Sequence, residues 1–209
     1  MPAAPDLVGR LLDATVTTIR AHAAQLTALD QAIGDGDHGV NLRRGFDAIA
    51  QARDELAALP LDQALQKAGM TLVMKVGGAS GPLYGSLLMA MGKAGAPQDP
   101  AGIAEALGEG IEAVKKRGRA DVGAKTMLDV LVPTLQALQE AAADGASIGE
   151  LTRKIRSVAA DALAATGPMR ATKGRASFLG ERSIGHLDPG AKSSALLIEA
   201  VCDVLEGGS

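Results

Sequence analysis

The sequence predicts an all-α fold from its composition and its helical periodicity. Apolar residues make up 47% of the 209 residues, yet there is no Trp, one Tyr and two Phe. The apolar content is mostly Ala, Leu, Val and Ile, a composition that favours helices over strands. Apolar residues recur at helical spacing, with breaks at glycines and prolines. We therefore expect one domain, residues 1–209, built as an antiparallel assembly of helices.

Eight helices are expected, joined mostly by short connections. Pro60 separates the second helix from the third, and Pro133 should kink the sixth. Ser147-Ile148-Gly149-Glu150 has the pattern of a capping box at a helix start. The expected ranges are 6–30, 41–59, 61–76, 83–94, 100–117, 125–143, 147–166 and 190–206.

Charge and cysteine content exclude several classes of protein. The net charge is −3, and the aromatic residues that stack on nucleic-acid bases are almost absent. Cys202 is expected as a small core residue, so nothing requires an oxidising compartment. The N-terminus has no basic region followed by an apolar core, and no apolar run approaches membrane-spanning length. We expect a cytoplasmic protein with no nucleic-acid or membrane partner.

Three aspartates lie close together between the first two expected helices. Asp30 is near the end of the first helix, and Asp35 and Asp37 lie on a glycine-rich turn. Carboxylates brought this close repel unless a cation lies between them, and oxygen ligands select Mg²⁺ or Ca²⁺. The next residues, His38 to Asn41, open a helix whose free N–H groups can bind an anion. The stretch therefore indicates a Mg²⁺–phosphate site.

Two other interpretations of this stretch were weighed. Asp-Gly-Asp is common in turns and helix caps, where it needs no metal. An EF-hand loop is excluded by register, since counting from Asp35 puts Gly39, Val40 and Phe46 at positions 5, 6 and 12.

A second glycine-rich stretch runs from Val76 to Gly85. Three glycines with Ala79 and Ser80 among them let the backbone approach a ligand, and Ser80 offers a hydroxyl. Pro82 then follows in the first turn of a helix. We favour a phosphate-side role over an ordinary interhelical turn.

A third stretch, residues 117–127, nearly matches a phosphate-binding P-loop. Gly118 and Gly123 have the required spacing, but Ala124 separates Gly123 from Lys125, and a helix precedes the motif instead of a strand. A P-loop is therefore rejected. A solvated turn capped by Thr126 and a ligand-contacting loop both stay open.

A long segment, residues 166–190, is expected to be a structureless loop that acts as a lid. It carries Arg170, Lys173, Arg175 and Arg182 in an otherwise acidic chain, and cationic side chains suit a polyphosphate. A disordered loop is the alternative, disfavoured because the apolar residues Phe178 and Leu179 need a packing surface.

Three motifs in this order resemble the nucleotide-binding L subunit (DhaL) of bacterial dihydroxyacetone kinase, over essentially the whole chain. They are Gly34-Asp35-Gly36-Asp37-His38-Gly39, the stretch Gly77 to Gly85, and Lys173-Gly174-Arg175-Ala176-Ser177-Phe178-Leu179-Gly180-Glu181-Arg182-Ser183-Ile184-Gly185-His186. The resemblance implies an eight-helix antiparallel barrel with a nucleotide at one end.

The resemblance also implies a set of site residues. Asp30, Asp35 and Asp37 would hold two Mg²⁺ ions that bridge the nucleotide phosphates, and with Arg175 they would supply the catalysis. The nucleotide, ADP or ATP held as a bound coenzyme, would contact His38, Gly39, Val40, Asn41, Ala79 and Ser80 on its phosphate and ribose side. Gly118 and Met127 would line the adenine site, and Arg175 with Asp188, Pro189 and Gly190 would close over the nucleotide.

The partners implied are a K subunit that binds dihydroxyacetone and an M subunit whose phosphohistidine regenerates ATP from ADP. A homodimer is kept as a further option. The chain lacks a K domain, and His38 stands where ATP-dependent relatives often carry Cys, which favours the phosphotransferase-linked form. Two alternatives stay open: an ATP-exchanging kinase subunit for another small or acyl substrate, and a non-enzymatic nucleotide-binding adaptor.

Overall fold

The computed structural model describes residues 6–207, and the elements in that range are helices. The expected domain, residues 1–209, also includes residues 1–5 and 208–209, which lie outside the described residues. The helices are α1 (Leu7–Ile33), α2 (His38–Gln51), α3 (Arg53–Ala57), α4 (Leu61–Lys75), α5 (Ser80–Lys93), α6 (Pro100–Gly118), α7 (Leu128–Ala143), α8 (Ile148–Ala165), the 3-10 helix η1 (Arg175–Ser183) and α9 (Pro189–Glu206).

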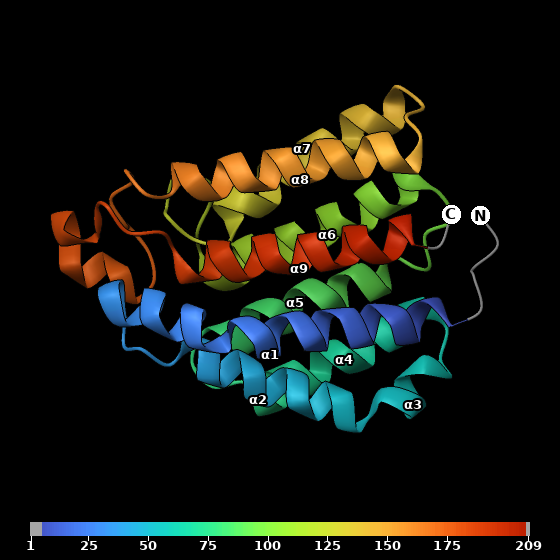
Figure 1. Ribbon diagram of the computed structural model, residues 1–209, viewed down its shortest axis with the longest axis horizontal. Coiled ribbons are helices and arrows are strands. Elements are labelled where there is room, and N and C mark those ends of the chain that lie inside the picture. Colours follow the sequence, from blue (N-terminus) through green and yellow to red (C-terminus); the bar gives the residue numbers. More distant parts are fainter. Residues whose placement is uncertain (1–5, 208–209) are drawn as a thin grey trace.

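The long helices form a closed ring. Each packs on its neighbour in the order α1, α2, α4, α5, α6, α7, α8 and α9, and α9 packs back on α1. Their axes lie along the long dimension of the molecule, with η1 at one end and the start of α1 and the end of α9 at the other (Figure 1). The expected all-α fold is confirmed. Among the described residues no helix is both long and apolar enough to cross a membrane.

The expected count of eight helices is not confirmed, because the described residues also form the short helix α3 and the 3-10 helix η1. The helix expected over 41–59 is interrupted at Ala52, which has φ −96° and ψ 11° and separates α2 from the short α3. The guanidinium of Arg53, the first residue of α3, lies 2.9 Å from the carboxylate of Asp6 and 3.0 Å from that of Asp13. These ion pairs bring α3 against the start of α1, a tertiary effect that local propensity does not report.

The core fills the ring with aliphatic side chains from every long helix of the closed set. Leu26, Leu42 and Leu72 are fully buried in its largest cluster. Cys202 is buried as expected, and burial raises the pKa of its thiol to about 11. The capping box at Ser147 and Glu150 is present.

The lid expected over 166–190 is ordered. It contains η1, which is kinked at Gly180, where φ is 58°. Leu179 packs with Ile33, Ala171 and Ala176, but the side chain of Phe178 is 84% exposed. The expectations of a structureless loop and of a packed Phe178 were therefore wrong. Leu179, Ala171 and Ala176 form the apolar contact with Ile33 of α1, and Phe178 takes no part in it.

Candidate functional site

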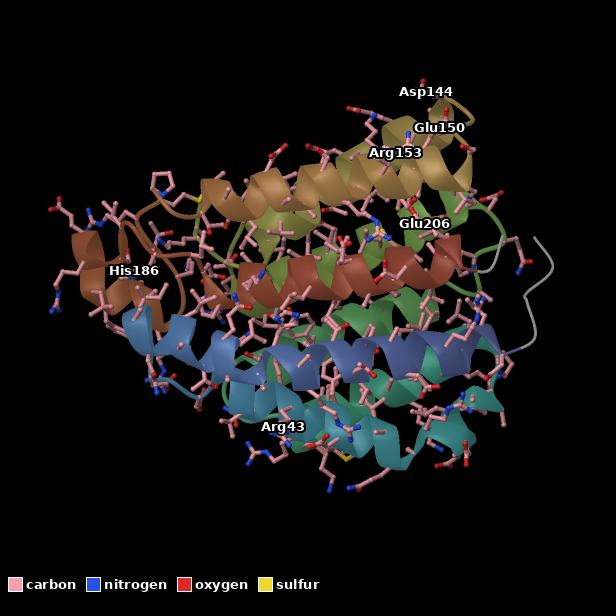
Figure 2. The ribbon with its side chains drawn as sticks, in the orientation of Figure 1. Arg43, Asp144, Glu150, Arg153, His186 and Glu206 are labelled. Atoms are coloured by element: carbon pink, nitrogen blue, oxygen red, sulfur yellow. The ribbon has the colours of Figure 1, made fainter. Side chains whose placement is uncertain are left out.

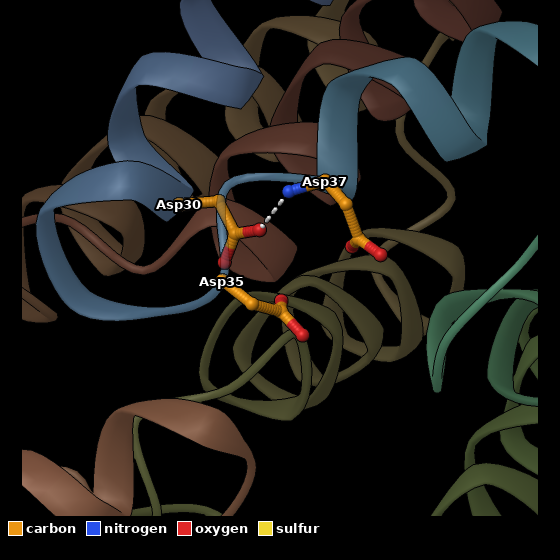
Figure 3. Close-up of side chains that lie close together, drawn as sticks. All are labelled: Asp30, Asp35 and Asp37. Atoms are coloured by element: carbon orange, nitrogen blue, oxygen red, sulfur yellow. Dashed lines mark hydrogen bonds between the residues drawn. The ribbon is translucent and has the colours of Figure 1, made fainter.

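The three aspartates converge at the end of the ring that carries the lid. One carboxylate oxygen from each of Asp30, Asp35 and Asp37 lies within 4.8 Å of the other two (Figure 3). Asp30 is 7% exposed, whereas Asp35 and Asp37 are open to solvent. The cluster is therefore closed to solvent on the side of Asp30 and open on the side of Asp35 and Asp37.

The local sequence explains why these carboxylates meet. Oδ2 of Asp30 accepts hydrogen bonds from the backbone N–H groups of Asp37 (2.8 Å) and His38 (3.0 Å), which folds the turn back over α1. A side chain at Gly34 would collide with the other oxygen of Asp30, and Gly36 has φ 77°, which favours glycine. Two glycines are thus required by the turn.

Oxygen donors in this arrangement fit a divalent cation such as Mg²⁺. Three carboxylates within reach of one point would repel without a counter-charge, and no softer ligand is among them. The open side of the cluster leaves room for phosphate oxygens and water to complete a coordination shell. The residues expected as metal ligands are therefore brought together.

Arg175 reaches this cluster from the lid. Its Nε lies 3.1 Å from Oδ2 of Asp35, and both side chains are largely exposed. An exposed ion pair of this kind contributes about 0–1 kcal/mol to stability. Its significance is positional, because it places a guanidinium beside the carboxylates from a segment far away in the sequence.

The starts of α2 and α5 lie next to each other at the same end. Nδ1 of His38 is 2.9 Å from Oγ of Ser80, and Nε2 is 2.9 Å from Oγ of Ser193. The Tyr84 hydroxyl continues the network, 2.7 Å from Ser193 and 2.9 Å from Ser194. The sequence analysis missed Tyr84 and the two serines, because separate hydroxyl residues in helices carry no motif.

Burial controls the protonation of this network. Desolvation lowers the pKa of His38, although Asp30 and Asp37 oppose the shift. Burial raises the pKa of Tyr84 to about 12, so its hydroxyl stays protonated. A neutral imidazole with a hydroxyl at each nitrogen orients the side chain of Ser80.

The other residues expected on the phosphate side differ in what they expose. Gly39 packs against α1, where a side chain would meet the carbonyl of Ala23, and Asn41 is buried, with its oxygen accepting from Arg44. Val40 is 60% exposed. What Gly39 and Val40 can offer an anion is their backbone N–H groups, since the first turn of a helix leaves these without intrahelical acceptors.

The two residues expected to line the adenine site, and the turn expected to close over the nucleotide, come from three parts of the chain. Met127 is buried just before α7 and lies against Gly190 in the first turn of α9. Gly118 ends α6 and faces Leu83, near the start of α5. The structure therefore joins Met127 to the Asp188-Pro189-Gly190 turn.

Asp188 is a buried carboxyl at the start of α9. Its Oδ2 accepts from the N–H of Ala191 (2.7 Å), and its own N–H donates to Oγ1 of Thr166 (3.2 Å). Burial raises the pKa of Asp188 to about 7, and the nearby Asp129 acts in the same direction. This side chain caps a helix and is partly neutral near pH 7.

The near-miss P-loop stretch is solvated in its first part, where residues 117–119 and 121–123 are exposed, and packed in its second part. Ala124, Lys125 and Met127 are buried, and Oγ1 of Thr126 accepts from the N–H of Leu128 (3.2 Å). The side chain of Asp129 accepts from the N–H groups of Gly123 and Thr126. The solvated-turn interpretation therefore holds for the residues before Ala124, whereas Lys125 is buried. Thr126 accepts one N–H of the first turn of α7, but the residue at the N-cap position is Met127.

A surface groove of about 880 Å³ lies between α1 and α2, and none of the three aspartates lines it. Val40, Arg43, Arg44 and Lys75 line one part of it, and alanines of α1 line another. Arg43 projects away from α2 in Figure 2, and His186 lies at the lid end. We place the candidate site at the carboxylates and not in this groove, because the groups that can bind a cation converge at the carboxylates.

The sequence is similar to that of known proteins over most of its length. The DAK2 domain model matches residues 32–203. The ADP-binding subunit DhaL of PEP-dependent dihydroxyacetone kinase 1 from Listeria innocua is 48% identical over 178 residues, 84% of each chain. The corresponding Escherichia coli K12 subunit is 40% identical, covering 83% of this chain and 84% of its own.

A solved structure also matches. The dihydroxyacetone kinase of C. freundii in complex with AMP-PNP and Mg²⁺ has a TM-score of 0.74 and 27% identity, over 97% of this chain. This chain spans about a third (34%) of that longer protein.

Fold and carboxylate geometry together describe an all-helical protein with a cluster suited to a divalent cation. With the matches above, the chain belongs to the DAK2-domain family. Within that family it is similar to the DhaL subunits of dihydroxyacetone kinase, so the expected resemblance is confirmed.

Proposed function

We propose that this chain is the ADP-binding subunit of a phosphoenolpyruvate-dependent dihydroxyacetone kinase. It would transfer a phosphoryl group from bound ATP to dihydroxyacetone held on a K subunit, and an M subunit with a phosphohistidine would regenerate the ATP. Residues 1–209 would act as one nucleotide-binding unit. A cytoplasmic location is part of the proposal, and a homodimer is a further option.

The observation that carries this proposal is the meeting of the carboxylate cluster with Arg175. Asp30 comes from the end of α1, and Asp35 and Asp37 come from the next turn. The guanidinium of Arg175 comes from a lid more than 130 positions later in the sequence. The names of the similar subunits specify ADP and dihydroxyacetone, and the C. freundii structure contains AMP-PNP and Mg²⁺. All of these fit metal-assisted phosphoryl transfer.

The roles of the residues follow from their positions. Asp30, Asp35 and Asp37 would hold two Mg²⁺ ions, which when bound neutralise charge on phosphate oxygens. Arg175 would stabilise the negative charge that develops on the transferred group. The N–H groups at the start of α2, with Ala79 and Ser80, would contact the phosphates and the ribose side. Gly118 and Met127 would line the adenine site, and the turn Asp188 to Gly190 would close over the nucleotide.

No general base for the substrate hydroxyl is assigned to this chain. His38 is the nearest imidazole to the cluster, but it is buried and both ring nitrogens face serine hydroxyls. A base must reach the proton that it removes. This arrangement is consistent with a substrate that is bound and deprotonated on the K subunit.

Reconstitution tests the proposal. The isolated chain with ATP and Mg²⁺ should not phosphorylate dihydroxyacetone, whereas the chain with K subunit, M subunit and a phosphorylated carrier should do so. Product formed by this chain alone would overturn the division of labour. Strong nucleotide binding with no transfer in the complete mixture would favour a nucleotide-binding adaptor.

A further inference from the structure

Lys125 is a buried cation outside the expected nucleotide contacts. Its side chain is 1% exposed. Its Nζ donates to the carbonyl oxygens of Gly167 (3.3 Å), Met169 (3.0 Å) and Ser183 (2.6 Å). A lysine ammonium has three N–H donors and no acceptor, so these three carbonyls use its full capacity.

Those carbonyls lie at the two ends of the lid, defined here as residues 167–183. Gly167 and Met169 are at its beginning, and Ser183 is the last residue of η1. The backbone beside the lysine takes part as well, because the carbonyl of Ala124 accepts from the N–H of Thr172 (3.2 Å). One residue pair before α7 therefore fastens both ends of the lid.

The lid has a second internal link between its ends. Oγ of Ser183 accepts from the N–H of Ala171 (2.9 Å) and donates to the carbonyl of Gly180 (2.6 Å). Between these fixed ends, Arg175 projects to Asp35 and Leu179 packs on the end of α1. The position of Arg175 thus depends on how the two ends are held.

The chemistry of Lys125 is costly for a residue that only fills space. Burying a cation is unfavourable unless its hydrogen bonds are replaced, and an apolar side chain would fill the same volume more cheaply. Lys125 also has φ 61°, a left-handed conformation that is unfavourable for residues other than glycine. Three directional bonds give what apolar packing does not, a fixed register of the lid.

We propose that Lys125 is a positioning residue that holds the lid so that Arg175 stands beside the Asp30–Asp35–Asp37 carboxylates. Its kinetic consequence rests on the proposed kinase function, whereas its structural consequence does not. Direct phosphate binding by Lys125 is incompatible with this arrangement, because its donors are all engaged with backbone oxygens.

Limited trypsin digestion of the nucleotide-free protein tests the structural part. The lid carries four exposed trypsin sites, at Arg170, Lys173, Arg175 and Arg182. Lys125→Met keeps the length of the side chain and removes the ammonium. We expect cleavage within the lid to accelerate about tenfold or more, because proteolysis follows the population of the opened state.

The control is Lys154→Met, which removes a lysine of α8 that pairs with Glu140 of α7 and should leave lid cleavage unchanged. Unchanged lid cleavage in Lys125→Met would overturn the proposal. So would equal acceleration at Arg153 and Arg156 on α8, since this would mean global destabilisation.

Amine acetylation of the unmodified chain provides a test without any substitution. Lys125 should be acetylated only when the lid opens, and therefore slowly, whereas Lys154 should be acetylated rapidly. Under mild urea, Lys125 labelling and lid cleavage should rise together. A lid that opens while Lys125 stays protected would contradict the proposal even if Lys125→Met does not fold.

Kinetics separate a positioning role from a merely structural one. In the reconstituted kinase, Lys125→Met should slow transfer, and the double variant with Arg175→Ala should be no slower than Arg175→Ala alone. Additive losses would overturn the positioning role. If the reconstituted kinase were inactive for other reasons, the trypsin and labelling results would still decide the structural part.

Discussion

Asp30 is held in place by the polypeptide itself before any cation binds. One of its oxygens accepts two backbone N–H groups from the turn that carries the other two carboxylates. Asp30, the most buried of the three carboxylates, therefore ties the turn to α1. This preorganisation leaves the exposed Asp35 and Asp37 to respond to a cation.

Asp35→Asn and Asp37→Asn should each remove most of the Mg²⁺-dependent affinity for ADP, by about tenfold or more, while helix content stays the same. The metal-free protein should tolerate either change or become more stable, since a repulsive charge is lost. Calorimetric titration of ADP with and without Mg²⁺ measures this.

The two variants serve as mutual checks, because only Asp35 is paired with Arg175. Asp161→Asn, an exposed change on α8, is the neutral control. Unchanged affinity in both site variants would remove the cation site from the account.

Arg175→Ala should slow phosphoryl transfer by about 10²–10³-fold while weakening ADP binding only a few-fold. A cation beside developing charge contributes mainly in the transition state, whereas the ground state is held by other contacts. Single-turnover rates compared with equilibrium affinities measure the difference. Arg182→Ala, on the same lid, is the control, and equal losses in rate and affinity for Arg175→Ala would indicate uniform binding.

Asp188→Asn should change how stability depends on pH. The pKa of Asp188 is about 7 when folded against 3.8 as the ordinary value, so the folded state binds more protons between these limits. Stability from this group is thus present at low pH and lost as pH rises from about 4 to about 7. Asn keeps the helix cap without titrating, so the variant should gain stability relative to the parent across this window.

Urea unfolding at several pH values measures this effect. Asp144→Asn, at the opposite end of the molecule in Figure 2, is the matched control and should give a curve parallel to the parent. A constant difference between Asp188→Asn and the parent would contradict the buried, partly neutral carboxyl.

At the scale of helices, the site depends on close approach between α1 and α2. A side chain at Gly39 would collide with the carbonyl of Ala23 and the hydroxyl of Thr27 on α1. Gly39→Ala should therefore destabilise the metal-free protein by roughly 1–3 kcal/mol, as overpacking does. Thermal unfolding measures the change.

Gly108→Ala in α6 is the control for this prediction. A methyl group there would make only ordinary contact with Leu135. Alanine in place of glycine within a helix should stabilise by about 0.5–1 kcal/mol. If both substitutions had the same effect, tight packing at Gly39 would not be the cause.

The helices and the carboxylates were predictable from sequence, because both depend on local patterns. Periodicity and proline positions located the long helices, and three aspartates within eight positions could hardly avoid meeting on one turn. The break at Ala52 was not predicted, since the ion pairs that Arg53 makes beyond it, with Asp6 and Asp13, are contacts between distant parts of the chain that local propensity does not report.

Lys125 shows why the ordered structure of the lid was not predicted, although the lid itself was. Its three acceptors are backbone carbonyls more than 40 positions away, and carbonyls carry no sequence signal. The exposed Phe178 was wrongly expected to pack, because hydrophobicity alone does not tell which apolar residue faces the protein.

At the scale of the whole molecule, the ring places every expected nucleotide contact at one end. The ends of α1 and α6, the starts of α2, α5, α7 and α9, and the lid all lie there, opposite the start of α1 and the end of α9 (Figure 1). A nucleotide held by metal ions and covered by a fastened lid should leave slowly, since release must break several contacts together. This is the property that a bound coenzyme requires and an exchanging substrate does not.

Retention of labelled ADP during turnover tests this most directly. The purified chain, loaded with labelled ADP and Mg²⁺, is supplied with K subunit, M subunit, phosphorylated carrier and dihydroxyacetone, and is then chased with excess unlabelled ADP. The account predicts many turnovers with the label still on the chain. Loss of the label with each turnover would contradict it and would identify an ATP-exchanging kinase subunit.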